Sequence, residues 1–221
     1  MVAIMMAFLG VTKSSAQVIP YKFSIGADLG MSGYAGDASS TLFRRPGLAF
    51  DGLFRYQYDA RWQFGGNLSF LTLSGNTEDM DGVRPGGIEY KFNSIVFDLN
   101  GRVDFHFFAY GIGETYKSLK RWSPYLTAGI GVSLAACSGN IAVGPNIPLG
   151  IGVRYKPSER LNLFTEFSVT KVFNDHIDGP DLSDLNQIKS SFIKNNDWYS
   201  RIVVGFTYEF GKRCETCHYV D

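Results

Sequence analysis

The chain has 221 residues, enough for one domain or one compact barrel and too few for two comfortable globular cores. Aromatic residues make up 15% of it and charged residues only 19%, which favours β-structure over disorder. The formal net charge is zero, and no stripe of Lys and Arg interleaved with aromatic residues is present, so a nucleic-acid partner is set aside.

The N-terminal segment predicts export. An apolar run from Val2 to Val11 is followed by the small residues Ser14, Ser15 and Ala16, a pattern typical of a signal peptide. We therefore expect a signal peptide over 1–16, a barrel over 17–210 and a periplasmic tail over 211–221. The apolar run is too short to span a membrane as a helix, and no later stretch holds about 18 uncharged apolar residues, which excludes a helical membrane protein.

Beyond the signal region, apolar residues alternate with polar or small ones, the two-residue period of a strand whose faces meet different surroundings. The pattern recurs about eight times. In chain order the expected strands run over Phe23–Ser32, Leu48–Tyr58, Trp62–Leu73, Ile95–Phe107, Leu126–Leu134, Ile147–Tyr155, Leu161–Val169 and Ser200–Phe210.

The connections alternate in length, as in an up-and-down barrel with short periplasmic turns and long outer loops. The short ones are Asp59-Ala60 and Pro157–Glu159. The long ones are Tyr34–Arg45, Gly75–Tyr90, Cys137–Asn146 and Asn174–Asn196, and Cys137 is expected to stay unpaired on its loop. One periplasmic link, Ala109–Ser123, is long and basic, so it is a candidate partner surface together with the start of the tail. The possible periplasmic contact residues are Lys117, Lys120, Arg121, Lys212 and Arg213.

Two barrels fit this pattern, a soluble lipocalin-like one with the aromatic set inside and a membrane barrel with that set facing lipid. An eight-stranded barrel encloses space for side chains and little more, so small residues should recur on its inner face. Here eight glycines of the strands fall in the polar register, namely Gly26, Gly30, Gly65, Gly129, Gly131, Gly150, Gly152 and Gly205. The sequence therefore predicts an all-β fold: an eight-stranded antiparallel up-and-down transmembrane β-barrel with a polar, plugged interior.

Charged residues of both signs share that inner register and are expected to pair across the lumen, because an unpaired buried charge is very costly. This lumen polar network comprises Asp28, Asp51, Arg55, Asp98, Arg102, Asp104, Arg154, Glu166, Arg201 and Glu209.

Aromatic residues near the strand ends suit two interfacial girdles, although ordinary β-propensity also explains them. They are Tyr21, Tyr56, Tyr58, Trp62, Tyr90, Trp122, Tyr155, Trp198, Tyr199 and Tyr208. The last strand resembles the terminal-strand signal read by the barrel-assembly machinery, carried by Gly205, Tyr208 and Phe210. Val203 departs from that signal, since a polar residue is usual there.

The chain carries no HExxH, GxxxxGK[ST] or GxSxG motif, so an enzyme is not predicted. His106, in the lumen register beside Asp104, is interpreted as structural. Lipid A-modifying barrels exist, but the His and Ser pairing of the deacylase family near the last strands is missing. Acidic loop clusters do not match the spacing of a calcium loop.

The tail contains Cys214-x-x-Cys217-His218, the sequence pattern of c-type haem attachment. Almost no chain follows to bury a haem, so a disulfide between Cys214 and Cys217, or free thiols, is the preferred interpretation over haem or a metal. No cofactor and no bound metal are predicted.

With the strands placed, the chain resembles the PorG family of Bacteroidetes outer-membrane barrels, associated with type IX secretion and gliding motility. The carrying segments are Asn146–Lys156, Glu166-Phe167, Lys171–Phe173 and Lys194–Ser200, with weaker matches at Arg45–Gly47, Phe105–Phe108 and Ser123–Tyr125.

The resemblance implies an outer-membrane component of the type IX protein secretion system that contacts outer-membrane lipid and a periplasmic lipoprotein ring, and that takes no small-molecule substrate. The alternative is a free-standing outer-membrane barrel for adhesion or envelope stability.

Overall fold

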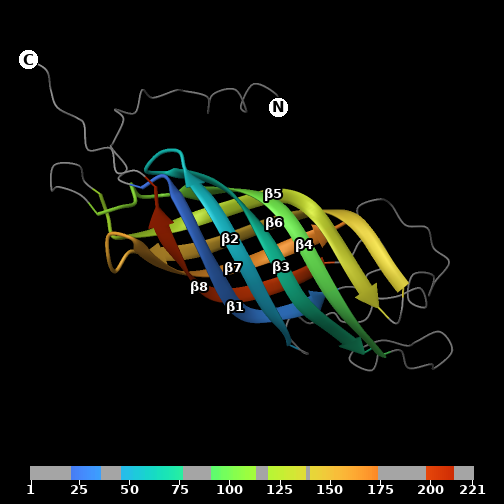
Figure 1. Ribbon diagram of the computed structural model, residues 1–221. Coiled ribbons are helices and arrows are strands. Elements are labelled where there is room, and N and C mark those ends of the chain that lie inside the picture. Colours follow the sequence, from blue (N-terminus) through green and yellow to red (C-terminus); the bar gives the residue numbers. More distant parts are fainter. Residues whose placement is uncertain are drawn as a thin grey trace, which may run out of the picture.

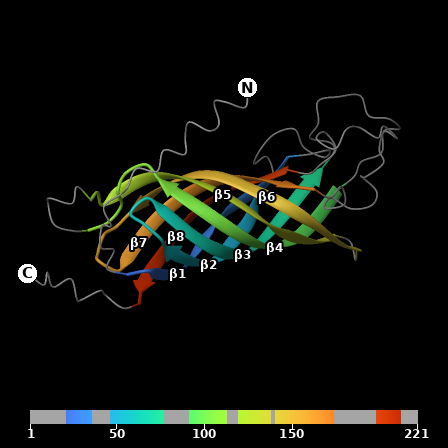
Figure 2. The same ribbon diagram turned by 90° about the horizontal axis from the view of Figure 1, so that it is seen from above.

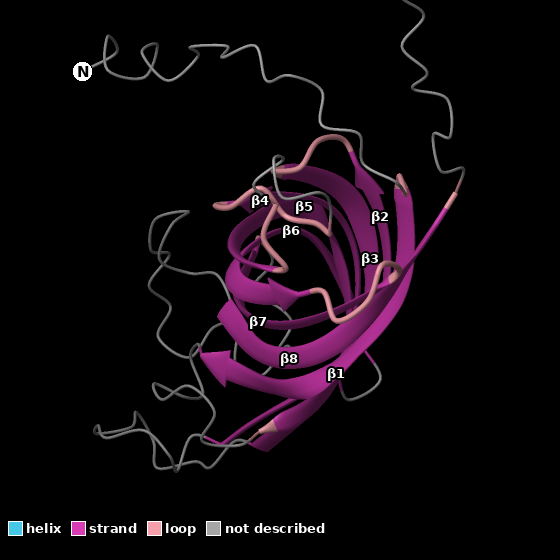
Figure 3. Ribbon diagram, turned by 90° about the vertical axis from the view of Figure 1, so that its left-hand side faces the viewer, coloured by secondary structure: helices cyan, strands magenta, loops and turns pink. Residues whose placement is uncertain are grey.

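The computed structural model describes residues 21–35, 46–76, 91–112, 119–137, 140–173 and 198–211. Antiparallel strands pair in chain order and the last pairs back onto the first, so the sheet closes into a barrel (Figures 1 and 3). The strands are β1 (Phe23–Ala35), β2 (Gly47–Gln57), β3 (Trp62–Asn76), β4 (Lys91–His106), β5 (Trp122–Cys137), β6 (Asn140–Tyr155), β7 (Leu161–Val172) and β8 (Trp198–Phe210). The predicted eight-stranded antiparallel barrel is confirmed. Within the ranges just given, no helix is long and apolar enough to cross a membrane.

Alternation along each strand separates the two faces of the wall. On β4, Phe97 is 46% exposed on the outside while its neighbour Asp98 is 1% exposed inside. On β8, Phe206 is exposed and Glu209 is buried. Large apolar side chains are exposed on every strand of the outer wall, a surface that water would not tolerate at this extent but that hydrocarbon solvates. The apolar set therefore faces lipid, and the soluble lipocalin-like alternative is excluded.

The two ends of the barrel differ. The turns 58–61 and 156–160 and the link 107–121 join strands at one end, where β1 begins and β8 ends. The ranges 36–45, 77–90 and 174–197, which carry the expected long loops, join strands at the other end and lie outside the described residues. Since outer-membrane barrels have short periplasmic turns, the first end is periplasmic. The strands are inclined to the barrel axis (Figure 2).

One expected loop is wrong. The segment predicted as a long outer loop, Cys137–Asn146, is strand on both sides: β5 extends to Cys137 and β6 begins at Asn140. Ile141 and Val143 face outward there, while Ala142 and Gly144 occupy the inner register. Because these inner residues are small and not polar, the two-residue period was hidden. Cys137 accordingly ends a strand and pairs in register with Ser94 and Asn140.

The inner register is also less uniformly polar than expected. A buried apolar cluster includes Leu71, Leu73, Val96, Ala135 and Val172. These residues lie in the strand halves next to the outer links. Val203, the residue that departs from the assembly signal, is 1% exposed and belongs to the same cluster. The interior thus has an apolar layer toward the outer end in addition to its charged groups.

Glycines allow neighbouring strands to approach on the inner face. A Cβ atom added at Gly30 would lie 1.9 Å from the carbonyl oxygen of Ile202, and one at Gly131 would lie 2.0 Å from Oδ1 of Asn100. At the outward-facing Gly52, an added Cβ would meet no atom within 4 Å. The inner wall is therefore crowded, as predicted for the polar register.

Two residues of the predicted girdles are misplaced. Tyr21 and Tyr199 are 6% and 1% exposed and lie within the protein, so they do not face the interface. Both hydroxyl groups find polar partners, Tyr21 with Arg160 and Tyr199 with Asp98. The exposed members are Tyr58, Trp62, Trp122, Tyr155, Trp198 and Tyr208. Tyr56 is half-buried, and Tyr90 lies outside the described residues.

Candidate functional site

The structure places all ten residues of the lumen polar network inside the barrel, and none of them is more than 8% exposed. Each sits in the inner register of its strand, where the next residue faces lipid. Because the strands carry both signs of charge, opposite charges from different strands meet across the lumen.

The central group is built around Asp104 on β4. Arg55 on β2 donates to this carboxylate, and Arg102 and Arg154 lie 3.6 Å and 3.5 Å from it. Arg102 also donates to Glu166 on β7 at 2.6 Å. Three guanidinium groups and two carboxylates thus form one connected network, which ties β2, β4, β6 and β7 together.

A second group lies nearer the outer end, around Arg201 on β8. Its Nη1 atom donates to both carboxylate oxygens of Asp51, at 3.0 and 2.7 Å, and to Ser69 at 2.9 Å. Its Nε atom donates to Ser168 at 2.8 Å. Asp28 pairs in register with Asp51, so two carboxylates adjoin this one guanidinium. On the same side, Asp98 accepts a hydrogen bond from Tyr199.

The periplasmic end holds a third group. Lys156, just after β6, lies 2.5 Å from the Oε1 atom of Glu209, which also accepts from Asn162 at 2.9 Å. Burial lowers the pKa of Lys156, and the Glu209 carboxylate opposes part of that effect. Tyr110, from the link after β4, donates its hydroxyl to Asn162 at 2.7 Å.

The ring of Tyr110 fills the periplasmic end of the lumen. It is 5% exposed and stacks on His106 with a centroid separation of 5.2 Å. Burial, with repulsion from Glu209 as a second cause, raises the pKa of Tyr110 above its ordinary value. The backbone amide of Tyr110 donates to Ala60 at 3.0 Å, which fixes the start of the link to the turn between β2 and β3.

His106 is enclosed by aromatic and cationic neighbours. Its other ring contact is Tyr125, at 5.5 Å, and its Nε2 atom lies 3.4 Å from Nη1 of Arg154. It is fully buried. Among the residues that the structure describes, no group of three or more His, Cys, Asp or Glu side chains is arranged to hold a metal ion.

Sequence reasoning missed several members of the interior. Lys156, Tyr110 and Tyr125 bind the charged groups or their partners, but only Tyr125 stands inside a strand, in the inner register. Tyr125 lies two residues after Ser123 and two before Thr127, so the two-residue period could have placed it in the lumen. Gln63, which alternation already puts on the polar face of β3, accepts from Arg154. Tyr110 stands in the irregular link, where no period exists to place it.

The candidate partner surface is described in part. Lys120 and Arg121 are exposed at the periplasmic end, and Nζ of Lys120 lies 3.9 Å from the ring centroid of Phe108. The backbone oxygen of Arg121 accepts from the amide of Lys156 at 2.7 Å. The remaining predicted contact and disulfide residues, Lys117, Lys212, Arg213, Cys214 and Cys217, lie outside the described residues, as do the signal peptide and nearly all of the tail.

The three residues of the predicted assembly signal lie on the last strand, β8, and their side chains alternate between its two faces. Gly205 faces inward, where an added Cβ would lie 2.4 Å from Cβ of Asp28 and 2.7 Å from Cζ of Phe164. Tyr208 and Phe210 face outward and are exposed.

An apolar outer wall, an ionic interior and short turns at one end together define a bacterial outer-membrane β-barrel. The sequence matches the family described as a domain of unknown function, DUF6089, over residues 1–219. The chain belongs to this family. A search of curated proteins found no match.

A solved structure shows the same fold, and two others are reported beside it. Neisserial surface protein A is similar, with a TM-score of 0.55 and 12% identity, covering 85% of this chain and 97% of that one. The attachment invasion locus protein Ail of Yersinia pestis, solved with a heparin analogue, has a TM-score of 0.49 and 13% identity, covering 86% and 99%. The outer-membrane protein OprG of Pseudomonas aeruginosa has a TM-score of 0.48 and 9% identity, covering 88% and 99%. At such identities the likeness to the first of these concerns the fold alone.

Proposed function

We propose that this barrel is an outer-membrane component of the type IX protein secretion system and that its periplasmic end contacts the periplasmic lipoprotein ring of that machine. The proposal assigns no reaction, cofactor or small-molecule substrate to the protein. It rests on the resemblance of segments such as Asn146–Lys156 to the PorG family and on one observation at the periplasmic end.

That observation is the fixed, basic link between β4 and β5. Tyr110 is bonded to Ala60 and Asn162, and the backbones of Lys120 and Arg121 are bonded to Ala109 and Lys156. Both ends of the link are therefore held against the barrel. At this end five described cations are exposed, Lys22, Arg61, Lys120, Arg121 and Arg160, against one exposed carboxylate, Glu159. A surface of this charge favours an acidic protein partner.

The test replaces both cations of the link, Lys120→Glu with Arg121→Glu, in the full chain. We expect loss of co-purification with the periplasmic ring and reduced secretion of type IX cargo, because like charges at a contact repel. Lys22→Glu, at the same end but outside the link, is the comparison that separates the charge of the link from the positive charge of this whole end. Raising the salt concentration should weaken the wild-type contact, since exposed charges are screened.

Deleting Gly211–Asp221 tests the tail separately. If the link variant secretes and co-purifies like wild type, the secretion proposal fails. If that variant then also adheres or protects the envelope normally while a barrel-deletion strain does not, the free-standing barrel for adhesion or envelope stability becomes the better interpretation.

A further inference from the structure

A row of outward-facing side chains crosses five strands of the lipid-facing wall. Trp62, Phe105, Leu126, Ile151 and Phe167 are successive register partners from β3 to β7. Because register partners lie side by side across a sheet, these large side chains form one continuous ridge.

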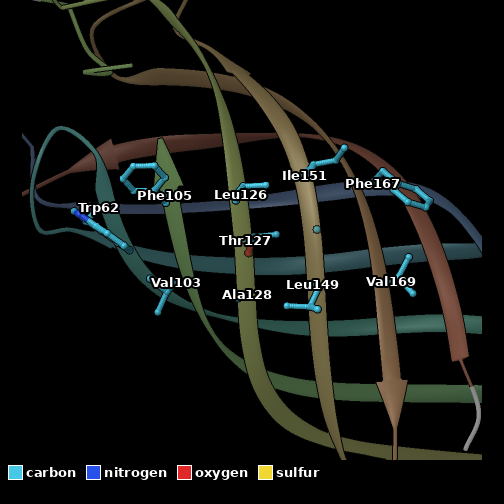
Figure 4. A pocket seen from close by; sticks show the side chains of 11 residues that line it. Trp62, Val103, Phe105, Leu126, Thr127, Ala128, Leu149, Ile151, Phe167 and Val169 are labelled. Carbon is cyan, nitrogen blue, oxygen red and sulfur yellow. The ribbon is translucent and has the colours of Figure 1, made fainter. Parts of the chain in front are cut away.

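A groove lies on one side of this ridge. A second row of register partners, Val103, Ala128, Leu149 and Val169, runs parallel to the ridge. Between the two rows is a cavity of about 500 Å³ (Figure 4). Ala128 is the smallest of the outward side chains here, and it leaves the floor of the groove open.

A second groove lies on the other side of the ridge. Its far bank is the row Phe107, Pro124, Val153 and Thr165, in which Phe107 donates its amide to Pro124 at 3.0 Å and the others are register partners. This cavity measures about 520 Å³. Two parallel apolar grooves thus share one ridge.

Both grooves rise from the periplasmic rim into the membrane. Trp62 is the first residue of β3, at the rim, whereas Phe167 is halfway along β7. From β3 to β7 the ridge spans four interstrand spacings of about 4.8 Å, or about 19 Å. Each groove therefore runs as an extended acyl chain would, from a headgroup at the periplasmic rim into the membrane.

Exposed cations stand where the grooves begin. Arg61 directly precedes Trp62. The carbonyl oxygen of Arg61 accepts a hydrogen bond from the backbone amide of His106 at 2.7 Å. Lys120 lies over the ring of Phe108, which packs edge-on against Trp122 at 5.1 Å. Positive charge at the head of a two-chain apolar groove is complementary to one class of molecule, an anionic phospholipid.

We propose that this wall binds a phospholipid of the periplasmic leaflet that has an anionic headgroup, with one acyl chain in each groove and the phosphate at Arg61 and Lys120. Within hydrocarbon the selection of one lipid over others comes from close van der Waals fit and from the headgroup charge, because burial of apolar surface contributes nothing there. The site goes beyond the proposed function and does not depend on it.

The test uses the purified full chain in detergent, with phosphatidylglycerol and phosphatidylcholine added in competition and bound lipid counted by native mass spectrometry. Phosphatidylglycerol should be retained preferentially by wild type. Ala128→Phe fills a groove and should lower its affinity about tenfold, equivalent to about 1.4 kcal/mol. Ala136→Phe places the same ring on the same face of β5 away from both grooves and should bind like wild type.

The headgroup is tested with Arg61→Gln, which should reduce retention of phosphatidylglycerol and leave that of phosphatidylcholine unchanged, with Lys22→Gln as the charge control. Circular dichroism and heat-dependent gel migration check that each variant is folded. Equal retention of the two lipids by wild type, or equal binding by the Ala128 and Ala136 variants, would overturn the proposal. Ala128→Phe should still co-purify with periplasmic partners, so failure of this site and failure of the secretion role are distinguishable.

Discussion

The Arg201 guanidinium shows what a single residue contributes to this interior. It is 1% exposed and is the ion-pair partner of Asp51, which itself adjoins Asp28. We predict that Arg201→Met lowers the free energy of unfolding by about 3–5 kcal/mol, because it leaves the buried Asp51 carboxylate without its ion-pair partner. Urea-induced unfolding of the barrel in lipid vesicles measures the loss.

The double variant Arg201→Met with Asp51→Leu is the control, because it removes both charges. It should recover much of the stability, since a buried ion pair replaced by apolar groups of similar volume is often neutral. A loss of only about 0–1 kcal/mol for the single variant, the size seen for exposed pairs, would contradict this account of Arg201.

The link between β4 and β5 contributes a stability that depends on pH. Tyr110 stays protonated in the folded barrel above its ordinary pKa of 10.0, because burial disfavours the phenolate. The unfolded chain ionises there, so stability present below about pH 10 is lost as the pH rises, by up to about 1.4 kcal/mol per pH unit. Tyr110→Phe should lack this alkaline loss.

At neutral pH the same substitution should cost about 0.5–1.5 kcal/mol, because Asn162 loses its hydrogen bond from Tyr110. The unfolding free energies of wild type and Tyr110→Phe are compared on either side of pH 10. The advantage of wild type at neutral pH should shrink and then reverse as the pH rises. Tyr58→Phe, at an exposed tyrosine, should show no such reversal. A constant difference between wild type and Tyr110→Phe at all pH values would mean that the link does not hold this ring in the lumen.

Strand elements were predictable wherever their inner face carries charge. β4 and β8 alternate between residues such as Phe97 and Asp98, so the sequence alone places both strands and their inward charges. The start of β6 was hidden because Ala142 and Gly144 present no polar contrast to Ile141 and Val143. The apolar layer was missed for the same reason.

Irregular segments and pairings across the lumen could not be predicted. Alternation assigns Arg102 and Glu166 to the same face, but which charges meet depends on the stagger of eight strands around the closed barrel. Tyr110 reaches the lumen only because its link folds back onto the turn at Ala60. The two lipid-facing grooves could not be predicted either. They lie between rows of side chains that are register partners on different strands, and no single strand shows them.

At the scale of the whole molecule, the interior of the described barrel is filled at three levels. The apolar cluster with Leu71 and Val96 and the ion pair of Arg201 with Asp51 lie toward the outer end, the network around Asp104 lies below them, and Tyr110 occupies the periplasmic end. Eight strands enclose little more than side chains need, and here those side chains are held by ion pairs. An interior filled in this way favours the proposed anchoring role over that of a diffusion channel.

We therefore predict that the purified full chain gives no sustained open conductance in a planar lipid bilayer, with a general porin as the positive control under the same conditions. Ions would have to break buried pairs such as Arg55 with Asp104, each costing several kcal/mol. A stable, ion-selective open level would show that the interior rearranges, and would contradict the anchoring role. Under the proposed secretion role, a closed barrel would require that cargo crosses the outer membrane beside this protein and not through it.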